Sequence, residues 1–510
     1  MKREQLLVCV CAVALYLPTV RSGFVQDDRA IIVSNPAAHS VSAALAAFDD
    51  PYWPHETGAG LYRPVTILSY ALDWTISGGR PGWLHLMNAL WHGLATVLLV
   101  VVLARWLPPL GAATAGLVFA WHPVHVEAVA SLVGRAELLV AVGILGAVLA
   151  ARRGYWTVAV VCAALAMLSK EHGVIAGVVI LLDRWLRPAP HADDRPYPTG
   201  FWIALGIVTV AFLAAWFAFG WVGENDAAAV FYGRGAWGRL AIALPAALRA
   251  AWLLVWPASL SVDYSPQVIP ARAGLSLAAI LGFCVLILGP ALVVWSRRRA
   301  PAISFAAALA ALSYLPTANL FFASGVALAE RNLYLAVALP AALIGCAATW
   351  LASRQGLRPA AVAAGILVTA GGARSLARLP AWADNRSQLL TLLLDHPESY
   401  RAHGSAAAVL AGLHDTAGAR REYRMADSLF SDDPYLEGAR AIFLIGIGDT
   451  ATAAPLIERW KGARVGQRVT LRAQFVLELA RQHRAQAQAI ADSASRRFAG
   501  EASWYRRYNQ

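Results

Sequence analysis

Long apolar segments separated by short polar loops are the feature that most restricts what this chain can fold into. A membrane-spanning helix needs about 20 predominantly apolar residues. We find eleven candidates, at residues 5–21, 83–105, 110–122, 136–151, 155–169, 172–187, 200–221, 273–296, 301–320, 332–352 and 358–377. The chain is 58% hydrophobic and 15% charged, whereas soluble domains carry about 25% charged residues. The sequence therefore predicts a mainly α, polytopic membrane domain over residues 1–380.

Basic residues give the expected orientation, because Lys and Arg concentrate in the cytoplasmic loops of membrane proteins. Lys2 and Arg3 place the N-terminus in the cytoplasm. The run Arg297–Arg299 falls on the same side only if residues 240–257 do not cross, so we interpret 240–257 as a re-entrant or surface helix. Eleven spans then put residues 381–510 on the non-cytoplasmic face. Because Ala and Arg are abundant and Lys is sparse, we expect a bacterial inner membrane with this part in the periplasm.

The net charge of +12 does not indicate a nucleic-acid partner. The basic residues are scattered in short loops, where cytoplasmic orientation and anionic lipid explain them. The five cysteines all lie in apolar segments and show no metal-ligand spacing. The sequence contains no Walker loop, no Gly-x-Gly-x-x-Gly run and no His-Glu-x-x-His motif. Direct use of a cytosolic nucleotide donor is therefore not expected.

Residues 381–510 have a different character, with more charge and no apolar run long enough to span a membrane. A repeat of 34 residues relates Asp415, Asp449 and His483, and the same spacing relates three alanines, Ala419, Ala453 and Ala487. This period is typical of tetratricopeptide helix pairs. The tetratricopeptide consensus residues are not visible, so a helical bundle without true repeats stays open. We predict a C-terminal helical-repeat domain.

Two adjacent carboxylates, Asp27 and Asp28, follow directly on the first apolar segment and begin the first outer loop, residues 22–82. Ionisable groups beside a membrane are costly and mark functional sites. Adjacent side chains point apart, so we expect a division of labour. One carboxylate would take a proton from an acceptor hydroxyl as general base, and the other would orient a cation or the acceptor. The alternative is a solvated turn that ends the helix.

Several further ionisable residues are predicted to lie near span ends on the same face as the Asp pair. Four are cations that would suit a lipid-linked phosphate: Arg63, Arg135, Lys170 and Arg331. The supporting set is His122, His125, Glu127, Glu137, Glu171, Asp263 and Glu330. Pairing of the cations with nearby glutamates is the alternative. His122, His125 and Glu127 are metal-ligand types, but Pro123 breaks any helix there, so a metal site stays open.

These residues occur in a set of ordered motifs along the membrane domain. The motifs are Phe24-x-x-Asp27-Asp28, Tyr62-Arg63-Pro64, His122-Pro123-x-His125-x-Glu127, Gly134-Arg135-Ala136-Glu137, Ser169-Lys170-Glu171, Asp263-Tyr264-Ser265 and Glu330-Arg331. Over about residues 1–390 the chain resembles the transmembrane-and-tetratricopeptide-repeat (TMTC) protein O-mannosyltransferases and their bacterial relatives.

The resemblance implies a membrane glycosyltransferase of the GT-C class. Its donor would be a polyprenyl-phosphate sugar, with mannose expected, and it would transfer the sugar with inversion to a protein hydroxyl on the non-cytoplasmic face. In this class the first outer loop supplies an acidic catalytic pair, which matches Asp27 and Asp28. Some members use a divalent cation such as Mg²⁺ or Mn²⁺ and others do not, so the cofactor stays open.

Two functions of other classes compete with this one. The membrane part could be a catalytically inactive anchor, with the repeats acting as a scaffold for periplasmic protein assembly. A transporter is disfavoured, because transporters place their sites near the midplane on broken helices, whereas the polar residues here cluster toward one face.

Overall fold

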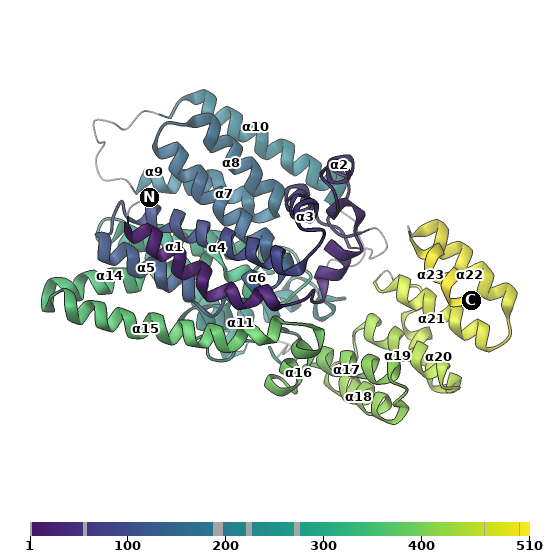
Figure 1. The fold of residues 1–510 in the computed structure, drawn as a ribbon. Helices are drawn as coiled ribbons and strands as arrows, with labels where there is room; N and C mark the ends of the chain where they lie inside the picture. The colour runs from purple at the N-terminus through teal and green to yellow at the C-terminus, as the bar shows by residue number, and fades with distance from the viewer. Residues whose placement is uncertain are drawn as a thin grey trace.

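The computed structural model describes residues 3–54, 59–186, 197–220, 227–269, 276–463, 465–498 and 500–509. In this part of the chain all the long regular elements are helices (Figure 1). Each predicted span coincides with one: α1 (Arg3–Tyr16), α4 (Pro81–Leu103), α5 (Pro109–Trp121), α7 (Arg135–Arg152), α8 (Trp156–Ser169), α9 (Ala176–Trp185), α10 (Thr199–Ala215), α12 (Leu277–Ser296), α13 (Pro301–Tyr314), α14 (Ala338–Gln355) and α15 (Leu357–Arg378). The prediction of a mainly α, multi-span membrane protein is confirmed.

Helix α7 lies inside the bundle, packed against α4, α8 and α9. Most of its residues are buried, whereas most of those in α10 and α12 are exposed. Because exposed apolar side chains need a lipid environment, α10 and α12 belong to the periphery. Small residues allow close helix contacts, as in membrane proteins generally. A Cβ atom on Gly345 of α14 would lie 2.5 Å from the carbonyl oxygen of Gly111 in α5.

Helix α11 (Ala236–Val255) covers most of the segment that we predicted not to cross the membrane. It is one continuous helix, long and apolar enough to span a bilayer. Near its start, Arg239 donates to the carbonyl oxygen of Leu320, which follows α13. Near its end, the carbonyl oxygen of Leu254 lies 3.2 Å from the ring of His122, which follows α5. By our topology both partners lie at the outer end of the bundle, which favours a helix along that end.

The C-terminal helices leave the bundle at the end of α15, on the side where α2 (Val41–Ala46) and α3 (Pro64–Ser77) lie (Figure 1). After α16 (Asn385–Asp395) they form pairs: α17 (Tyr400–Gly412) with α18 (Thr416–Leu429), α19 (Pro434–Gly446) with α20 (Thr450–Trp460), and α21 (Gln467–Ala480) with α22 (Arg484–Arg497), followed by α23 (Glu501–Asn509). The second helices begin at Thr416, Thr450 and Arg484, a spacing that reproduces the 34-residue repeat.

The residues that revealed the repeat have structural roles in it. Asp415 and Asp449 are N-caps of α18 and α20, where their carboxylates accept hydrogen bonds from main-chain N–H groups. The three alanines of the repeat, Ala419, Ala453 and Ala487, are all buried where the helices of a pair meet.

Candidate functional site

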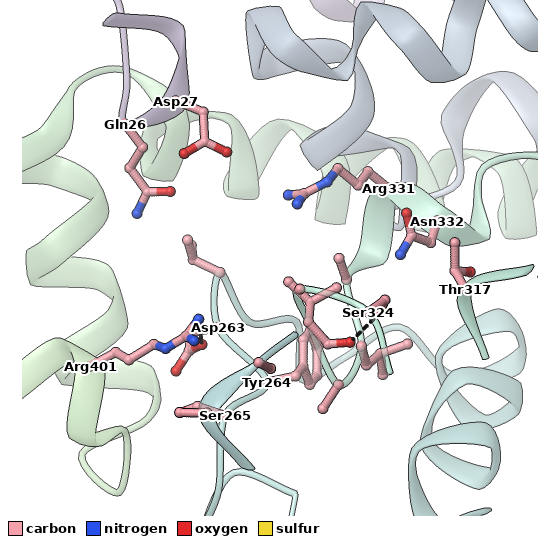
Figure 2. Close-up of a pocket in the computed structure, with 18 of the residues that line it drawn as sticks. Gln26, Asp27, Asp263, Tyr264, Ser265, Thr317, Ser324, Arg331, Asn332 and Arg401 are labelled. Carbon is pink, nitrogen blue, oxygen red and sulfur yellow. Dashed lines mark hydrogen bonds and ion pairs between the residues drawn. The ribbon is translucent and has the colours of Figure 1, made fainter. Parts of the chain in front are cut away.

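A cavity of about 770 Å³ lies between the outer loops of the membrane domain and helices α17 and α19. Of the residues predicted for the site, seven line it: Asp27, Arg63, Glu137, Lys170, Glu171, Asp263 and Arg331. These residues are brought together from five separate loops or helix ends. Figure 2 shows Asp27 and Arg331 on one side of the cavity and Asp263, Tyr264 and Ser265 on the other.

The two adjacent carboxylates have different surroundings. Asp27 points into the cavity (Figure 2) and makes no hydrogen bond or ion pair with any atom that the structure describes. Asp28 is fully buried outside the cavity lining. Its Oδ2 accepts from the N–H of Val25 at 2.9 Å, and its Oδ1 accepts from the N–H of Val133 at 3.0 Å. Asp28 therefore fastens the first outer loop to the start of α7, and Asp27 is left free to act in the cavity.

Burial also changes the acidity of Asp28. Removal from water raises its pKa to about 7, although the hydrogen bonds from Val25 and Val133 oppose the shift. The turn before the pair is held by Gln26, which adopts a left-handed backbone conformation with φ of 44°. The main-chain N–H of Gln26 donates to Asn385 at the start of α16, at 2.7 Å. The C-terminal region thus helps to set the turn that presents Asp27.

Arg63, the residue before α3, is held in a fixed orientation. Its Nε and Nη2 donate to the two carboxylate oxygens of Glu171 at 3.0 and 2.9 Å. Its guanidinium also lies 4.9 Å from the centre of the Tyr52 ring, a cation–π contact. Its Nη1 has no partner in the described chain, so one group of donors remains available to a ligand.

Lys170 and Arg331 are oriented in the same way by buried glutamates. The ammonium of Lys170 is paired with Glu137 and donates to the amide oxygen of Asn332 at 3.1 Å. The guanidinium of Arg331 is paired with Glu127, which also accepts from the main-chain N–H of Arg331 at 2.9 Å. Nε and Nη2 of Arg331 have no partner among the described residues. Three cations are therefore held in place, and each retains at least one donor without a partner among the described residues, because the ammonium of Lys170 has a third N–H.

Arg135 is placed differently from our prediction of a phosphate-binding residue. It is completely buried and does not line the cavity. Its guanidinium pairs with Asp73 of α3 and donates to Asn88 and to the carbonyl oxygen of Leu84 in α4. Its face lies 4.7 Å from the centre of the Tyr70 ring. With its donors used inside the protein, Arg135 joins α3, α4 and α7 and is not available to a ligand.

Four other predicted site residues also lie outside the cavity lining: Glu127, which holds Arg331, and His122, His125 and Glu330. The His122 ring contacts the carbonyl oxygen of Leu254, and the His125 ring contacts that of Tyr334 at 3.0 Å. Glu330 is buried, and its Oε1 accepts from the N–H of Ser261 and the hydroxyl of Tyr264, at 2.6 and 2.8 Å. Burial raises the pKa of Glu330 to about 8. These residues organise the loops around the cavity.

Asp263 connects the membrane domain to the C-terminal helices. Its Oδ2 accepts from the hydroxyl of Ser399 at 2.8 Å, and its Oδ1 lies 3.6 Å from Nη1 of Arg401. Ser399 is the N-cap of α17, and Arg401 lies in its first turn. The cavity is thus closed by residues from both parts of the chain.

The sequence analysis missed the residues that α17 and α19 contribute to the cavity. They include Tyr400, Arg401 and Asp433, the last of which accepts from the hydroxyl of Tyr400 at 2.7 Å. They lie in a region that looks like an ordinary solvated repeat, so no local signal marks them. Asn332 was also missed, although it follows the Glu330-Arg331 motif directly.

The described residues contain no group of three or more His, Cys, Asp or Glu side chains arranged to hold a metal ion. His122, His125 and Glu127 do not converge, because each contacts a different partner.

Comparisons with known proteins point to one group of enzymes. The chain is 28% identical to human protein O-mannosyl-transferase TMTC3 over 375 residues, which are 65% of this chain and 41% of that protein. It is 28% identical to protein O-mannosyl-transferase F38B6.6 of Caenorhabditis elegans, over 65% of this chain and 49% of that protein. It is 40% identical to Drosophila melanogaster Tmtc2 over 139 residues, or 26% of this chain and 15% of that protein. The chain spans less than half the length of these relatives.

Among solved structures, the chain is similar to ArnT from Cupriavidus metallidurans, in a crystal structure with undecaprenyl phosphate bound. The TM-score is 0.36 at 17% identity, over 78% of this chain and 80% of that one. No protein-family profile matches the chain. The resemblance inferred from the motifs agrees with these sequence relatives: over 65% of its length, the chain is similar to TMTC protein O-mannosyl-transferases at 28% identity.

Proposed function

We propose that this protein is an integral-membrane glycosyltransferase. It transfers a sugar, expected to be mannose, from a polyprenyl-phosphate donor to a Ser or Thr hydroxyl of a protein on the non-cytoplasmic face, with inversion. The observation that carries the proposal is Asp27, a carboxylate without a hydrogen-bond partner in the described chain, which shares a cavity with three fixed cations. The homology to TMTC protein O-mannosyl-transferases supports the sugar and the acceptor class.

The reaction assigns a separate task to each group. The acceptor hydroxyl oxygen attacks the anomeric carbon of the sugar while the bond from that carbon to the phosphate oxygen breaks. Asp27 takes the hydroxyl proton as general base. Arg63, Lys170 and Arg331 donate to the departing polyprenyl phosphate, whose negative charge increases as the bond breaks. A single displacement of this kind inverts the anomeric carbon.

The arrangement of the cations favours a leaving phosphate. Each one is held by a glutamate, the partly buried Glu171 or the buried Glu137 and Glu127, so its orientation is set before the donor arrives. Such fixed donors stabilise developing charge without the cost of reorganisation during the reaction. Arginine adds paired donors that match phosphate oxygens.

The test is transfer from radiolabelled polyprenyl-phosphate-mannose in membranes that contain the wild-type protein or Asp27→Asn. Label that enters a protein fraction with the wild type only establishes the reaction class and the role of Asp27. Full transfer by Asp27→Asn contradicts that role. If neither protein consumes this donor, the mannosyltransferase proposal fails, and deletion of residues 385–510 then tests the scaffold alternative by loss of partner binding.

A further inference from the structure

Five consecutive residues of the loop between α13 and α14, Gly325 to Ala329, line the cavity. Ala329 has an extended backbone, with φ of −140° and ψ of 139°. None of the five main-chain N–H groups donates to any atom in the part of the chain that the structure describes. Ala327, Leu328 and Ala329 are nevertheless buried. Because buried N–H groups are almost always hydrogen-bonded, this segment presents donors that need a partner from outside the chain.

One buried side chain, Asn319, decides which way these groups point. Its Nδ2 donates to the carbonyl oxygens of Val326 and Ala327 at 3.0 and 3.2 Å. Its Oδ1 accepts from the N–H of Ser324 at 2.7 Å. All peptide bonds in the described chain are trans, so the N–H of each peptide points away from its own carbonyl oxygen. The N–H groups of Ala327 and Leu328 therefore both point away from Asn319.

Two successive N–H groups on one side of the backbone form a small concave site, in which both can donate to a single oxygen atom. A second unpartnered group lies in the same cavity. Ser265 is only 5% exposed, and its hydroxyl has no hydrogen-bond partner in the described chain. Figure 2 shows Ser265 and Ser324 on the side of the cavity that faces Asp27 and Arg331. This side, which also carries Asp263, thus offers neutral donors opposite Asp27 and Arg331.

We propose that the N–H groups of Ala327 and Leu328, together with the Ser265 hydroxyl, bind the main chain of the acceptor, an extended polypeptide segment. The inference rests on the proposed function and specifies its acceptor. The N–H pair would donate to a carbonyl oxygen of the peptide, and the target hydroxyl would then face Asp27. A polypeptide in extended conformation has carbonyl groups free for such bonds, as in other cases of strand recognition.

The charge of this wall distinguishes a peptide carbonyl from the donor phosphate. No residue from Leu315 to Ala329 is charged. Three residues of this loop that also line the cavity, Phe322, Val326 and Leu328, are apolar. A phosphate would leave its charge uncompensated there, whereas Arg63, Lys170 and Arg331 offer it cations elsewhere in the cavity. A neutral carbonyl oxygen suits the N–H pair without a counter-charge.

The first experiment uses the wild-type protein in membranes with labelled polyprenyl-phosphate-mannose and nine-residue peptides that contain one central Thr. Each peptide is compared with analogues in which one amide is replaced by an ester, which weakens that carbonyl as an acceptor. We expect one or two positions to raise KM by about 2- to 10-fold, the effect of one hydrogen bond, with kcat little changed. The same sequence closed into a stapled helix should react poorly.

Two outcomes would overturn the inference while the proposed function stands. One is equal transfer to octyl glycosides, which have hydroxyls but no main chain. The other is equal KM values for amide, ester and stapled peptides. If the donor is not consumed with any of these acceptors, the proposed function fails, and the inference fails with it.

Asn319→Asp provides the matching test in the protein. Asp tolerates the left-handed conformation of this position, φ of 57°, but lacks the NH₂ group that holds the two carbonyls. We expect KM for the peptide to rise about 3- to 10-fold and KM for the donor to stay constant. Ser313→Ala, which removes a hydroxyl bonded only to a carbonyl in its own helix, is the control. A rise in the donor KM instead would assign the loop to the phosphate and overturn the proposal.

Discussion

The cavity has two walls that hold their charged side chains differently. One wall belongs to the membrane domain, and the other is formed by α17 and α19. On the membrane side, Arg63 makes two hydrogen bonds to Glu171, at 2.9 and 3.0 Å, and 13% of its side chain is exposed. On the other side, Nη1 of Arg401 lies 3.6 Å from Asp263, and 41% of the Arg401 side chain is exposed. Fixed charges suit a step in which charge develops, whereas a loosely held charge suits contact with variable acceptors.

The largest expected effect comes from Asp27, the charge on the membrane side that has no partner among the described residues. Asp27→Asn removes the general base but keeps the size of the side chain. We expect kcat for mannose transfer to fall about 10²- to 10⁴-fold, with unchanged thermal stability of the detergent-solubilised protein. Transfer of radiolabelled mannose to protein measures kcat, and the melting midpoint of the solubilised protein measures its thermal stability.

Asp28→Asn is the matched control, because it changes the adjacent and chemically identical residue. Asn has one oxygen and cannot accept from both Val25 and Val133. The melting midpoint should fall while the fully folded fraction keeps much of its kcat. If the two variants lose the same kcat at equal stability, the assignment of separate tasks to Asp27 and Asp28 is wrong.

The next effect concerns the fixed cations. Arg331→Lys keeps the charge but loses the planar group of donors that contacts Glu127 and that we propose to bind the phosphate. We expect KM for polyprenyl-phosphate-mannose to rise about 10-fold, or roughly 1.4 kcal/mol. Arg135→Lys should leave that KM unchanged and lower the melting midpoint instead, because Arg135 joins helices inside the protein. A donor KM that responds equally to both variants would contradict the distinction.

The same two arginines show what the sequence could and could not predict. Each predicted span depends on a local apolar pattern and coincides with a helix, and the helix starts at Thr416, Thr450 and Arg484 have the 34-residue spacing seen in the sequence. Arg63, Lys170 and Arg331 were expected beside a ligand and line the cavity. Arg135 was expected there too, but its partners Asp73 and Asn88 come from other helices, and no local pattern reveals them.

A division of tasks between the adjacent carboxylates was expected, but the second one was predicted to orient a cation or the acceptor, whereas Asp28 lies outside the cavity lining and accepts two main-chain hydrogen bonds. Asp28 is buried because the N–H of Val133, more than 100 residues away, needs an acceptor. The left-handed turn at Gln26 depends on Asn385 in the C-terminal region. The part of the cavity formed by α17 and α19 escaped prediction for the same reason, since Arg401 matters only through its approach to Asp263.

Two buried carboxyls outside the spans make stability depend on pH. Burial raises the pKa of Asp28 to about 7 and that of Glu330 to about 8, whereas both titrate near 4 in an unfolded chain. Their contribution to stability is therefore complete below about pH 4 and is lost as pH rises through 7 and 8. We expect the melting midpoint of the solubilised protein to fall between pH 5 and pH 8.5.

The double variant Asp28→Asn/Glu330→Gln tests the origin of this dependence. It removes both titrating groups, so the slope of the melting midpoint against pH should become flatter over the same interval. A slope equal to that of the wild type would show that other groups are responsible.

The smallest effect should come from the wall formed by α17 and α19, where the charge of Arg401 is loosely held. Arg401→Ala removes a cation that lines the cavity but is partly exposed and weakly paired. Exposed ion pairs are worth about 0.2–1 kcal/mol, so KM for the acceptor peptide should rise by no more than about 5-fold, and KM for the donor should not change. Arg420→Ala is the control: Arg420 is paired with Asp449 at 2.9 Å, is 39% exposed and lies outside the cavity. If Arg401→Ala lowers kcat as strongly as Asp27→Asn does, the second wall takes part in the chemistry, and the contrast between fixed and adaptable charges no longer holds.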